Sequence, residues 1–218
     1  MPVEARTAIL SAIRSANGHA SDLPAADLEY ARIPRTYNQH SSLSRDETIA
    51  LLTERLIDYN AHVVPCTPDQ VPSAIRSALE QHNANQILIP QDLPAHLLPD
   101  GLEVAVDHNL SPAQLDRFDA AVTLGALAIA ETGTIILEGV SGQGRRAATL
   151  VPDVHVCILN TENIVTGVPE GFARLASAST LPLTFVSGPS ATADIEMTRI
   201  KGVHGPRHLH ILLLQHAT

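Results

Sequence analysis

Three short strings in the last third of the chain combine glycine with hydroxyl, acidic or imidazole side chains. They are AETGT (130–134), GPSATADIE (188–196) and GVHGP (202–206), and each lies beside an apolar run. Glycine lets the backbone approach a ligand closely, and small hydroxyl groups form hydrogen bonds without bulk. Loops of this kind at the ends of buried strands are natural positions for a small-molecule site. We therefore place the candidate site in these strings.

Four side chains in these strings could do acid–base chemistry, and we take them as catalytic candidates. Glu131 could be a general base or hold a ligand hydroxyl, or it could be a solvated residue of a glycine-containing hairpin. Asp194 and Glu196 fall in the first turn of a helix predicted to begin near Ser190. They could act as a base, bind a divalent cation or hold substrate hydroxyls, or they could only stabilise the helix dipole. His204 lies in a turn, a suitable place for an acid–base imidazole.

A second set of residues could anchor an anion. The loop GVSGQGRR (139–146) offers backbone N–H groups and the guanidinium groups of Arg145 and Arg146, which suit carboxylate or phosphate. Otherwise the loop is a surface flap with solvated charges. It matches neither the P-loop nor the dinucleotide-binding fingerprint. The ligand-binding candidates are Thr132, Gly133, Thr134, Arg145, Arg146, Gly188, Ser190, Thr192 and Gly205.

Cysteine and histidine patterns argue against a metal cofactor in this chain. Cys66 and Cys157 lie far apart in apolar runs, whereas an ordinary iron–sulfur cluster needs four thiolates. We expect both to be reduced thiols in the core. His208 and His210 share one face of a predicted strand, but they lack a nearby cysteine or a suitably spaced carboxylate. We therefore predict no metal site.

The elements that must position these residues alternate along the first half of the chain. Helices are predicted by apolar spacing over 3–16, by a capping box at 44–47 with an apolar stripe to about 60, and by prolines at 68 and 112. Residues 19–43 lack periodicity and are predicted to be a linker or a wrapping arm. Short apolar strands are predicted at 62–66, 86–89 and 103–106. Strands alternating with helices indicate a parallel sheet covered on both faces.

After residue 120 the pattern changes to short apolar runs, several of them separated only by tight glycine turns, with helices fitting 169–177 and the segment after 190. Some of these strands must pair as hairpins, so we predict an α/β fold with a mixed, largely parallel sheet covered by helices. The predicted organisation is an N-terminal helical arm over 1–43 and an α/β domain over 44–218.

Composition limits the possible partners. The chain has 218 residues with 44% hydrophobic content, enough for one full core, and its net charge is −9. An acidic surface is repelled by nucleic acid and by anionic membranes. The N-terminal stretch lacks the basic end and apolar core of a signal peptide, and no segment reaches the length of a membrane span. We expect a cytoplasmic protein with no nucleic-acid partner and no membrane insertion.

The runs AETGTIIL, GPSATADIE and GVHGP, in this order and spacing, resemble the LUD domain family, closest to its lactate utilization protein C branch. The resemblance covers roughly residues 40–214. It implies a fold of the ribose-5-phosphate isomerase and CoA-transferase type. It also implies a role in the oxidation of L-lactate to pyruvate, together with iron–sulfur lactate utilization proteins. The clusters are then expected only in those partners, with no cofactor in this chain.

Two classes of function remain open at this point. As an enzyme subunit, the chain would bind lactate, pyruvate or a phosphorylated or acyl ligand in a pocket. As a non-catalytic subunit, it would dock iron–sulfur partners through the arm or an apolar face. A sugar-phosphate or acyl-CoA-type enzyme is a third option, which rests on fold analogy alone. Polar groups converging on an anion would favour the first class, and an exposed apolar patch would favour the second.

Overall fold

The computed structural model describes residues 3–16, 23–140, 142–175, 181–192, 200–201 and 205–215. The chain divides into two units, Met1–Asn38 and Gln39–Thr218. The first unit holds α1 (Val3–Ala16), as predicted, and α2 (Leu23–Arg32). The prediction of an irregular linker is wrong at α2. Pro24 occupies the second position of that helix, where proline is compatible with a helix start, and alanine, leucine and glutamate follow.

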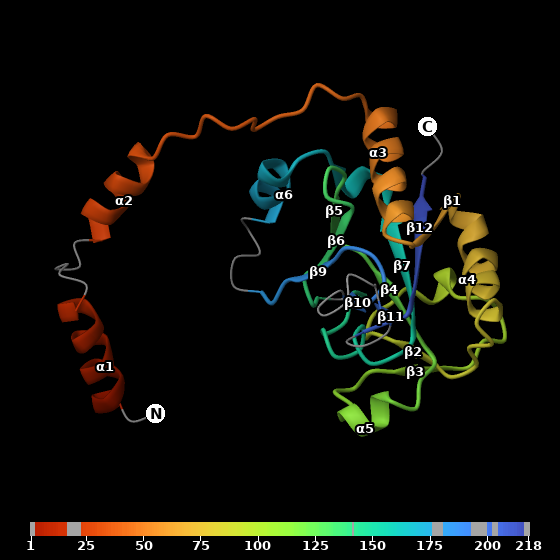
Figure 1. Ribbon diagram of the computed structural model, residues 1–218. Helices are drawn as coiled ribbons and strands as arrows, with labels where there is room; N and C mark the ends of the chain where they lie inside the picture. Colours follow the sequence, from red (N-terminus) through yellow and green to blue (C-terminus); the bar gives the residue numbers. More distant parts are fainter. Residues whose placement is uncertain are drawn as a thin grey trace. The chain divides into compact units, whose positions relative to one another are not determined.

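Six strands form a large, entirely parallel sheet in the order β1-β12-β7-β4-β2-β3 (Figure 1). Its central strands are apolar along nearly their whole length because both faces of the sheet are covered. The strands are β1 (His62–Cys66), β2 (Ile87–Ile89), β3 (Val104–Val106), β4 (Ala120–Leu124), β7 (Val154–Asn160) and β12 (His208–Leu214).

The hairpins predicted after residue 120 form a second sheet, in the order β8-β5-β6-β9. β6 pairs antiparallel with both β5 and β9, whereas β8 pairs parallel with β5. A two-stranded antiparallel sheet joins β10 and β11. The antiparallel pairs therefore lie outside the large sheet. The strands are β5 (Leu127–Ile129), β6 (Thr134–Leu137), β8 (Ile164–Val165), β9 (Thr184–Val186), β10 (Ala191–Thr192) and β11 (Ile200–Lys201).

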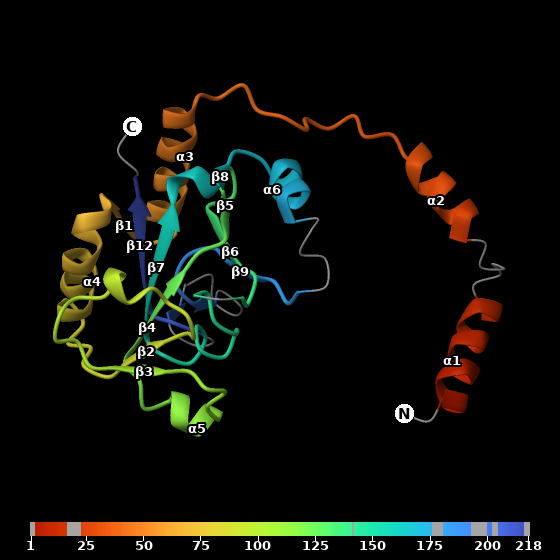
Figure 2. The same cartoon turned by 180° about the vertical axis from the view of Figure 1, so that it is seen from behind.

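Helices complete the layers of the second unit. α4 packs on one face of the large sheet, while α3 and the small sheet pack on the other (Figures 1 and 2). α6 contacts the small sheet through β5. The α-helices of this unit are α3 (Arg45–Asp58), α4 (Val71–Glu80), α5 (Pro112–Leu115) and α6 (Val168–Leu175), and the short 3-10 helices are η1 (Pro68–Gln70), η2 (Ala95–Leu97) and η3 (Thr161–Asn163).

Local sequence signals explain how α3 begins and how it is held. The Ser44 hydroxyl accepts a hydrogen bond from the Glu47 N–H at 3.3 Å, and the Glu47 carboxylate accepts one from the Ser44 N–H at 2.8 Å. This is the predicted capping box. Leu52 and Leu56 on the apolar face of the helix are fully buried. α3 is therefore a fixed support for the loops that pack on its last turn.

Both cysteines are buried, as predicted. Cys66 packs in the cluster beneath α4, and Cys157 in the cluster beneath α3, so the sheet separates them. Burial raises the pKa of both thiols, that of Cys157 to about 12. A thiol with a raised pKa is a poor nucleophile, which fits a packing role. Among the helices of the described segments, none is long and apolar enough to cross a membrane.

Candidate functional site

A pocket of about 300 Å³ lies at the end of the large sheet where β7 and β12 begin. His155 of β7 and Leu209 of β12 line it from the sheet. The other walls come from Arg146 and the turns after it, from β9 with the loop that follows, and from residues 205–206 before β12. We call this the Arg146 pocket. Segments far apart in sequence thus form one cavity within the size range of ligand sites.

Four of the predicted ligand-binding residues line this pocket: Arg146, Gly188, Ser190 and Gly205. The Ser190 N–H donates a hydrogen bond to the Pro206 carbonyl at 2.7 Å. A Cβ added to Gly205 would lie 3.4 Å from the Ser190 Cβ, so the two loops are closely packed. The structure therefore brings together the GPS loop, the GP turn and one of the two adjacent arginines.

The last turn of α3 supports two of the glycine loops. Gly188 has a positive φ of 85°, and a Cβ at this position would lie 2.6 Å from the Cβ of Tyr59. Gly133 has a φ of 59°, and its added Cβ would lie 2.8 Å from the Cβ of Arg55. Only glycine fits such left-handed, crowded positions without strain. The end of α3 therefore determines where the AETGT turn and the GPS loop lie.

A chain of hydroxyl groups joins the AETGT turn to the pocket wall. Thr132 Oγ1 lies 2.8 Å from Thr134 Oγ1, which lies 2.8 Å from Ser187 Oγ. Ser187 lines the Arg146 pocket, whereas the two threonines do not. Thr132 and Thr134 are thus connected to the pocket wall by a chain of hydrogen bonds that ends at Ser187. Sequence reasoning missed Ser187, although its position directly before Gly188 was a usable signal.

Glu131 lies at the exposed tip of the β5–β6 hairpin. Its backbone N–H donates to the Thr166 carbonyl at 3.0 Å, and its side chain is near Gly167. It is not among the residues that line the Arg146 pocket. Of the two interpretations made from the sequence, this geometry matches the solvated hairpin glutamate.

His155 is the buried polar residue of the pocket floor, and the sequence did not single it out. Its Nε2 lies 2.9 Å from Thr123 Oγ1 on the neighbouring strand β4, and the residue is 2% exposed. Burial lowers the pKa of His155 to about 4, so the imidazole is neutral at physiological pH. Its second ring nitrogen has no partner among the described residues. The floor thus offers a neutral group that can donate or accept a hydrogen bond, depending on the tautomer.

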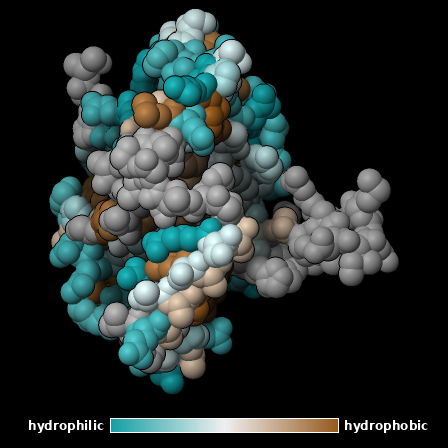
Figure 3. Space-filling model, turned by 90° about the vertical axis from the view of Figure 1, so that its left-hand side faces the viewer, coloured by the Kyte–Doolittle hydropathy of each residue, from teal (hydrophilic) through white to brown (hydrophobic). Residues whose placement is uncertain are grey.

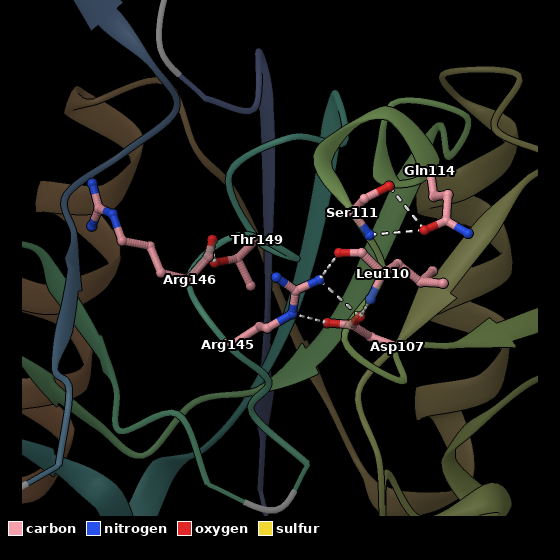
Figure 4. A network of polar contacts seen from close by, with 7 residues as sticks. All are labelled: Asp107, Leu110, Ser111, Gln114, Arg145, Arg146 and Thr149. Carbon is pink, nitrogen blue, oxygen red and sulfur yellow. Dashed lines mark hydrogen bonds and ion pairs between the residues drawn. The ribbon is translucent and has the colours of Figure 1, made fainter.

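The adjacent arginines point in different directions (Figure 4). Backbone bonds from Ala148 to Arg145 and from Thr149 to Arg146 wind this segment into tight turns. Arg146, Thr149 and Leu150 consequently line the Arg146 pocket together. The Arg146 guanidinium is exposed and makes no hydrogen bond or ion pair with the described residues. It is therefore available to an anion.

Arg145 lies in a different pocket, of about 510 Å³, at the ends of β2 and β3, which we call the Arg145 pocket. Its Nε and one terminal nitrogen donate to the Asp107 carboxylate at 2.8 and 3.1 Å, and the same terminal nitrogen donates to the Leu110 carbonyl. Burial alone would raise the pKa of Asp107, but the hydrogen bonds from Arg145 and the Leu110 backbone outweigh it and lower the pKa. Arg145 is thus engaged with an internal carboxylate, apart from Arg146.

Several predictions fall on or beside residues that the structure does not describe. Asp194, Glu196 and His204 lie outside the described residues. The helix predicted to begin near Ser190 is wrong at its first residues. Ala191 and the backbone of Thr192 form β10, which pairs antiparallel with β11. A β-branched threonine favours this extended pairing over the expected N-cap.

A cluster of four histidines is a feature that sequence reasoning found only in part. His210 stacks on His62 with ring centroids 4.6 Å apart, and His82 stacks on His208 at 3.9 Å. The Nε2 atoms of His82 and His210 lie 2.9 Å apart. Burial, followed by the neighbouring imidazoles, lowers the pKa of His210 to about 4. In the described part of the chain, no group of three or more histidine, cysteine or acidic residues is arranged to hold a metal ion.

The Arg146 pocket combines a guanidinium group that no described residue pairs with, a hydroxyl-lined wall and a neutral imidazole. A planar guanidinium forms paired, charge-assisted hydrogen bonds with carboxylate or phosphate. Glycine at positions 188 and 205 keeps the loop backbones open to a ligand. The chemistry of this site therefore suits a small anion that also carries a hydroxyl or carbonyl group.

Comparison with known proteins agrees with this architecture. A crystal structure of a DUF162 family protein from Deinococcus radiodurans matches with a TM-score of 0.70 and 40% identity, covering 79% of this chain and 99% of that one. A lactate utilization protein C from Deinococcus radiodurans is 42% identical over 82% of this chain and 84% of its own length. One from Halalkalibacterium halodurans is 29% identical over 77% and 78%, respectively.

The family comparison covers most of the second unit. The LUD domain model matches residues 49–214, which include the Arg146 pocket, the β5–β6 hairpin and the large sheet. The resemblance noted from the three glycine-containing strings is thereby confirmed. The chain belongs to the LUD domain family.

Proposed function

We propose that this chain is a component of L-lactate oxidation to pyruvate and that the Arg146 pocket binds the small carboxylate anion involved. The Arg146 guanidinium, which has no partner among the described residues, lies in a pocket lined by both glycine loops, and this observation carries the proposal. Membership of the LUD domain family and the similarity to lactate utilization proteins C support the assignment to this pathway.

In the proposed complex, Arg146 binds the carboxylate of lactate or pyruvate through charge-assisted hydrogen bonds. The neutral imidazole of His155 then faces the C2 oxygen, which is a hydroxyl in lactate and a carbonyl in pyruvate. A neutral imidazole can pair with either oxygen through its choice of tautomer. Oxidation of lactate to pyruvate removes two electrons and two protons. We assign acceptance of the electrons to iron–sulfur clusters in partner proteins, and the protons pass to solvent. The two buried cysteines of this chain serve packing instead.

The direct test is a titration of the purified chain with L-lactate and with pyruvate, in which calorimetry measures binding. Arg146→Ala should weaken binding at least about tenfold, the usual cost of losing a hydrogen-bonded charge. Arg117→Ala is the matched control, because Arg117 is exposed and lies outside this pocket. Absence of binding by the wild-type chain, both alone and with its partners, would contradict the assignment of the ligand.

A genetic test asks whether the pocket matters for the pathway. A strain that lacks this chain should grow on L-lactate when it receives the Arg117→Ala variant but not the Arg146→Ala variant. Equal growth with both variants at equal protein levels would show that the pocket is not required for lactate oxidation.

A second candidate function, that of a docking subunit, is favoured by one exposed apolar feature. Phe172 of α6 and Phe185 of β9 are 54% and 45% exposed, and their rings stack with centroids 6.1 Å apart. Exposed aromatic pairs often mark protein interfaces. Figure 3 shows one face of the molecule, on which brown apolar areas are interrupted by teal hydrophilic ones.

Phe172 distinguishes the two candidates because, unlike Phe185, it does not line the Arg146 pocket. Under the docking hypothesis, Phe172→Ser abolishes co-purification with the iron–sulfur partners and leaves the affinity for lactate unchanged. Unchanged co-purification would remove this surface as the docking site.

A further inference from the structure

A third pocket, of about 400 Å³, lies between the start of α3, the strand β8 and α6. Arg45, the first residue of α3, and Arg174, in the last turn of α6, both line it. Ile164 and Ala173 add apolar wall, and His40 and Leu43 line it from the segment that precedes α3. We call it the Arg45–Arg174 pocket. None of its residues lines the Arg146 pocket.

The two guanidinium groups are held along the same short stretch of backbone. Arg45 donates to the Ile164 carbonyl at 2.9 Å, and Arg174 donates to the Glu162 carbonyl at 3.1 Å. The carbonyls belong to residues only two positions apart. Each of these bonds uses one terminal nitrogen, so both guanidinium groups retain further N–H donors. The geometry thus fixes two planar cations side by side without consuming their capacity to bind an anion.

Neither arginine has a carboxylate partner at ion-pair distance among the described residues. Desolvation, followed by the charge of Arg174, lowers the pKa of Arg45, while the more weakly coupled Glu162 raises it. The pocket therefore contains a net repulsion between like charges.

Glu170 is the carboxylate in this pocket, and it already accepts hydrogen bonds from the backbone. One of its oxygens accepts the Thr166 N–H at 3.0 Å and the Gly167 N–H at 3.2 Å. Burial alone would raise the pKa of Glu170, but these backbone bonds and a further one from Ser41 lower it. Glu170 thus stabilises the start of α6 and the segment before α3. It keeps its negative charge, but its hydrogen bonds go to backbone N–H groups, and it forms no ion pair with either arginine.

We propose that Arg45 and Arg174 form a second binding site, specific for the phosphate group of a small molecule. The several oxygens of a phosphate group accept the remaining N–H donors of both guanidinium groups. A carboxylate has only two oxygens with which to accept them. The bound phosphate would connect α3, α6 and the segment around His40 and Leu43, which leads to the N-terminal unit.

The test uses the full chain with the Arg146→Ala substitution, so that anion binding at the Arg146 pocket does not contribute. It measures thermal stability and affinity with inorganic phosphate, methyl phosphate and acetate at equal ionic strength. Phosphate and methyl phosphate should bind and raise the melting temperature, and acetate should not. Comparable binding of methyl phosphate indicates a phosphate ester as the ligand, whereas binding of inorganic phosphate alone indicates the free ion. Either result supports the site. Equal effects of phosphate and acetate would overturn it.

Substitution of the two arginines tests whether phosphate binds at this pocket. In the same Arg146→Ala chain, Arg45→Gln and Arg174→Gln should each weaken phosphate binding roughly tenfold, as expected for the loss of a charge-assisted contact. Arg117→Gln should leave it unchanged. The Arg146→Ala chain itself should bind phosphate, so failure at the Arg146 pocket is distinguishable from failure here. Phosphate affinity that persists in the Arg45→Gln/Arg174→Gln double variant would refute the proposal.

A second readout does not depend on measuring affinity. Amide hydrogen exchange around Leu43, whose N–H donates to the Ser41 hydroxyl at 3.1 Å, should slow in the presence of phosphate. The Arg45→Gln variant, which retains the capping box of α3, should lose this protection. Unchanged exchange on addition of phosphate to the wild-type chain would also count against the site.

Discussion

The Arg145 pocket lies beside β2 and β3 and the Arg146 pocket beside β7 and β12, and each receives one of two adjacent arginines. At the carboxyl ends of β2 and β3, Arg145 is neutralised by Asp107, whose side chain is only 3% exposed. At the amino ends of β7 and β12, Arg146 has no partner among the described residues. The same residue type thus supports structure in one pocket and is available for binding in the other. The surroundings, rather than the residue type, determine the role.

The largest expected effect is a difference in protein stability between variants of the two arginines. Arg145→Ala leaves the buried Asp107 carboxylate unpaired and should lower the free energy of unfolding by about 3–4 kcal/mol. Arg146→Ala, its matched control, removes an exposed charge and should change the free energy by less than about 0.5 kcal/mol. Chemical denaturation of both variants measures the difference. Equal stabilities would mean that the contrast between the pockets is wrong.

The two pockets should also differ in pH dependence. His155 has a pKa of about 4 in the folded chain, below the ordinary 6.5, so the unfolded state binds more protons between these values. Its stabilising contribution is complete above about pH 6.5 and falls by about 3 kcal/mol as the pH drops towards 4. Asp107 also has a lowered pKa, so its contribution is lost only below about pH 4.

Unfolding curves recorded from pH 7 to 4 test this difference. His155→Gln should flatten the dependence, while His96→Gln, at an exposed position, should leave it as in the wild type. His210 titrates in the same window, so some slope remains in the His155→Gln variant. A dependence that is the same in both variants would contradict a buried, neutral His155.

Glycine substitutions compare the backbone of the two pockets. Gly188 lines the Arg146 pocket and Gly144 the Arg145 pocket, and both have a positive φ, of 85° and 76°. An added Cβ would lie 2.6 Å from the Tyr59 Cβ at Gly188 but 3.1 Å from the Pro90 Cβ at Gly144. Gly188→Ala should therefore cost about 2–3 kcal/mol and Gly144→Ala about 1 kcal/mol, by thermal unfolding. The reverse order would show that the GPS loop can move away from α3.

The smallest effect concerns the hydroxyl chain in the wall of the Arg146 pocket. Ser187→Ala removes the partner of Thr134 and should cost about 1 kcal/mol, the net value of one hydrogen bond. Ser73→Ala, where the hydroxyl bonds only to the exposed Gln70 carbonyl, serves as the control. Differential scanning calorimetry resolves such a difference. If Ser187→Ala is as stable as the control, the chain of hydroxyls does not hold the AETGT turn to the wall.

Local signals predicted much of the fold. The capping box at Ser44, the proline starts and the apolar strands appear where the sequence places them, because these patterns depend on neighbouring residues. The divergence of Arg145 and Arg146 could not be predicted, because it depends on Asp107, far away in sequence. The place of His155 in the pocket could not be predicted for the same reason, because its partner Thr123 lies on another strand. Contacts across the sheet become visible only once strand order and register are known.

The position of β12 has a consequence for the synthesis of this protein. β12 lies between β1 and β7 in the large sheet, although it comes last of all the strands and β1 comes first. During translation, nearly the whole second unit is therefore synthesised between β1 and its neighbour β12, so β1 leaves the exit tunnel long before β12 does. Pairing between such distant segments is slow and leaves apolar strand edges exposed in the meantime. We expect the nascent chain to depend on chaperones that shield β1 and β7 until translation is almost complete.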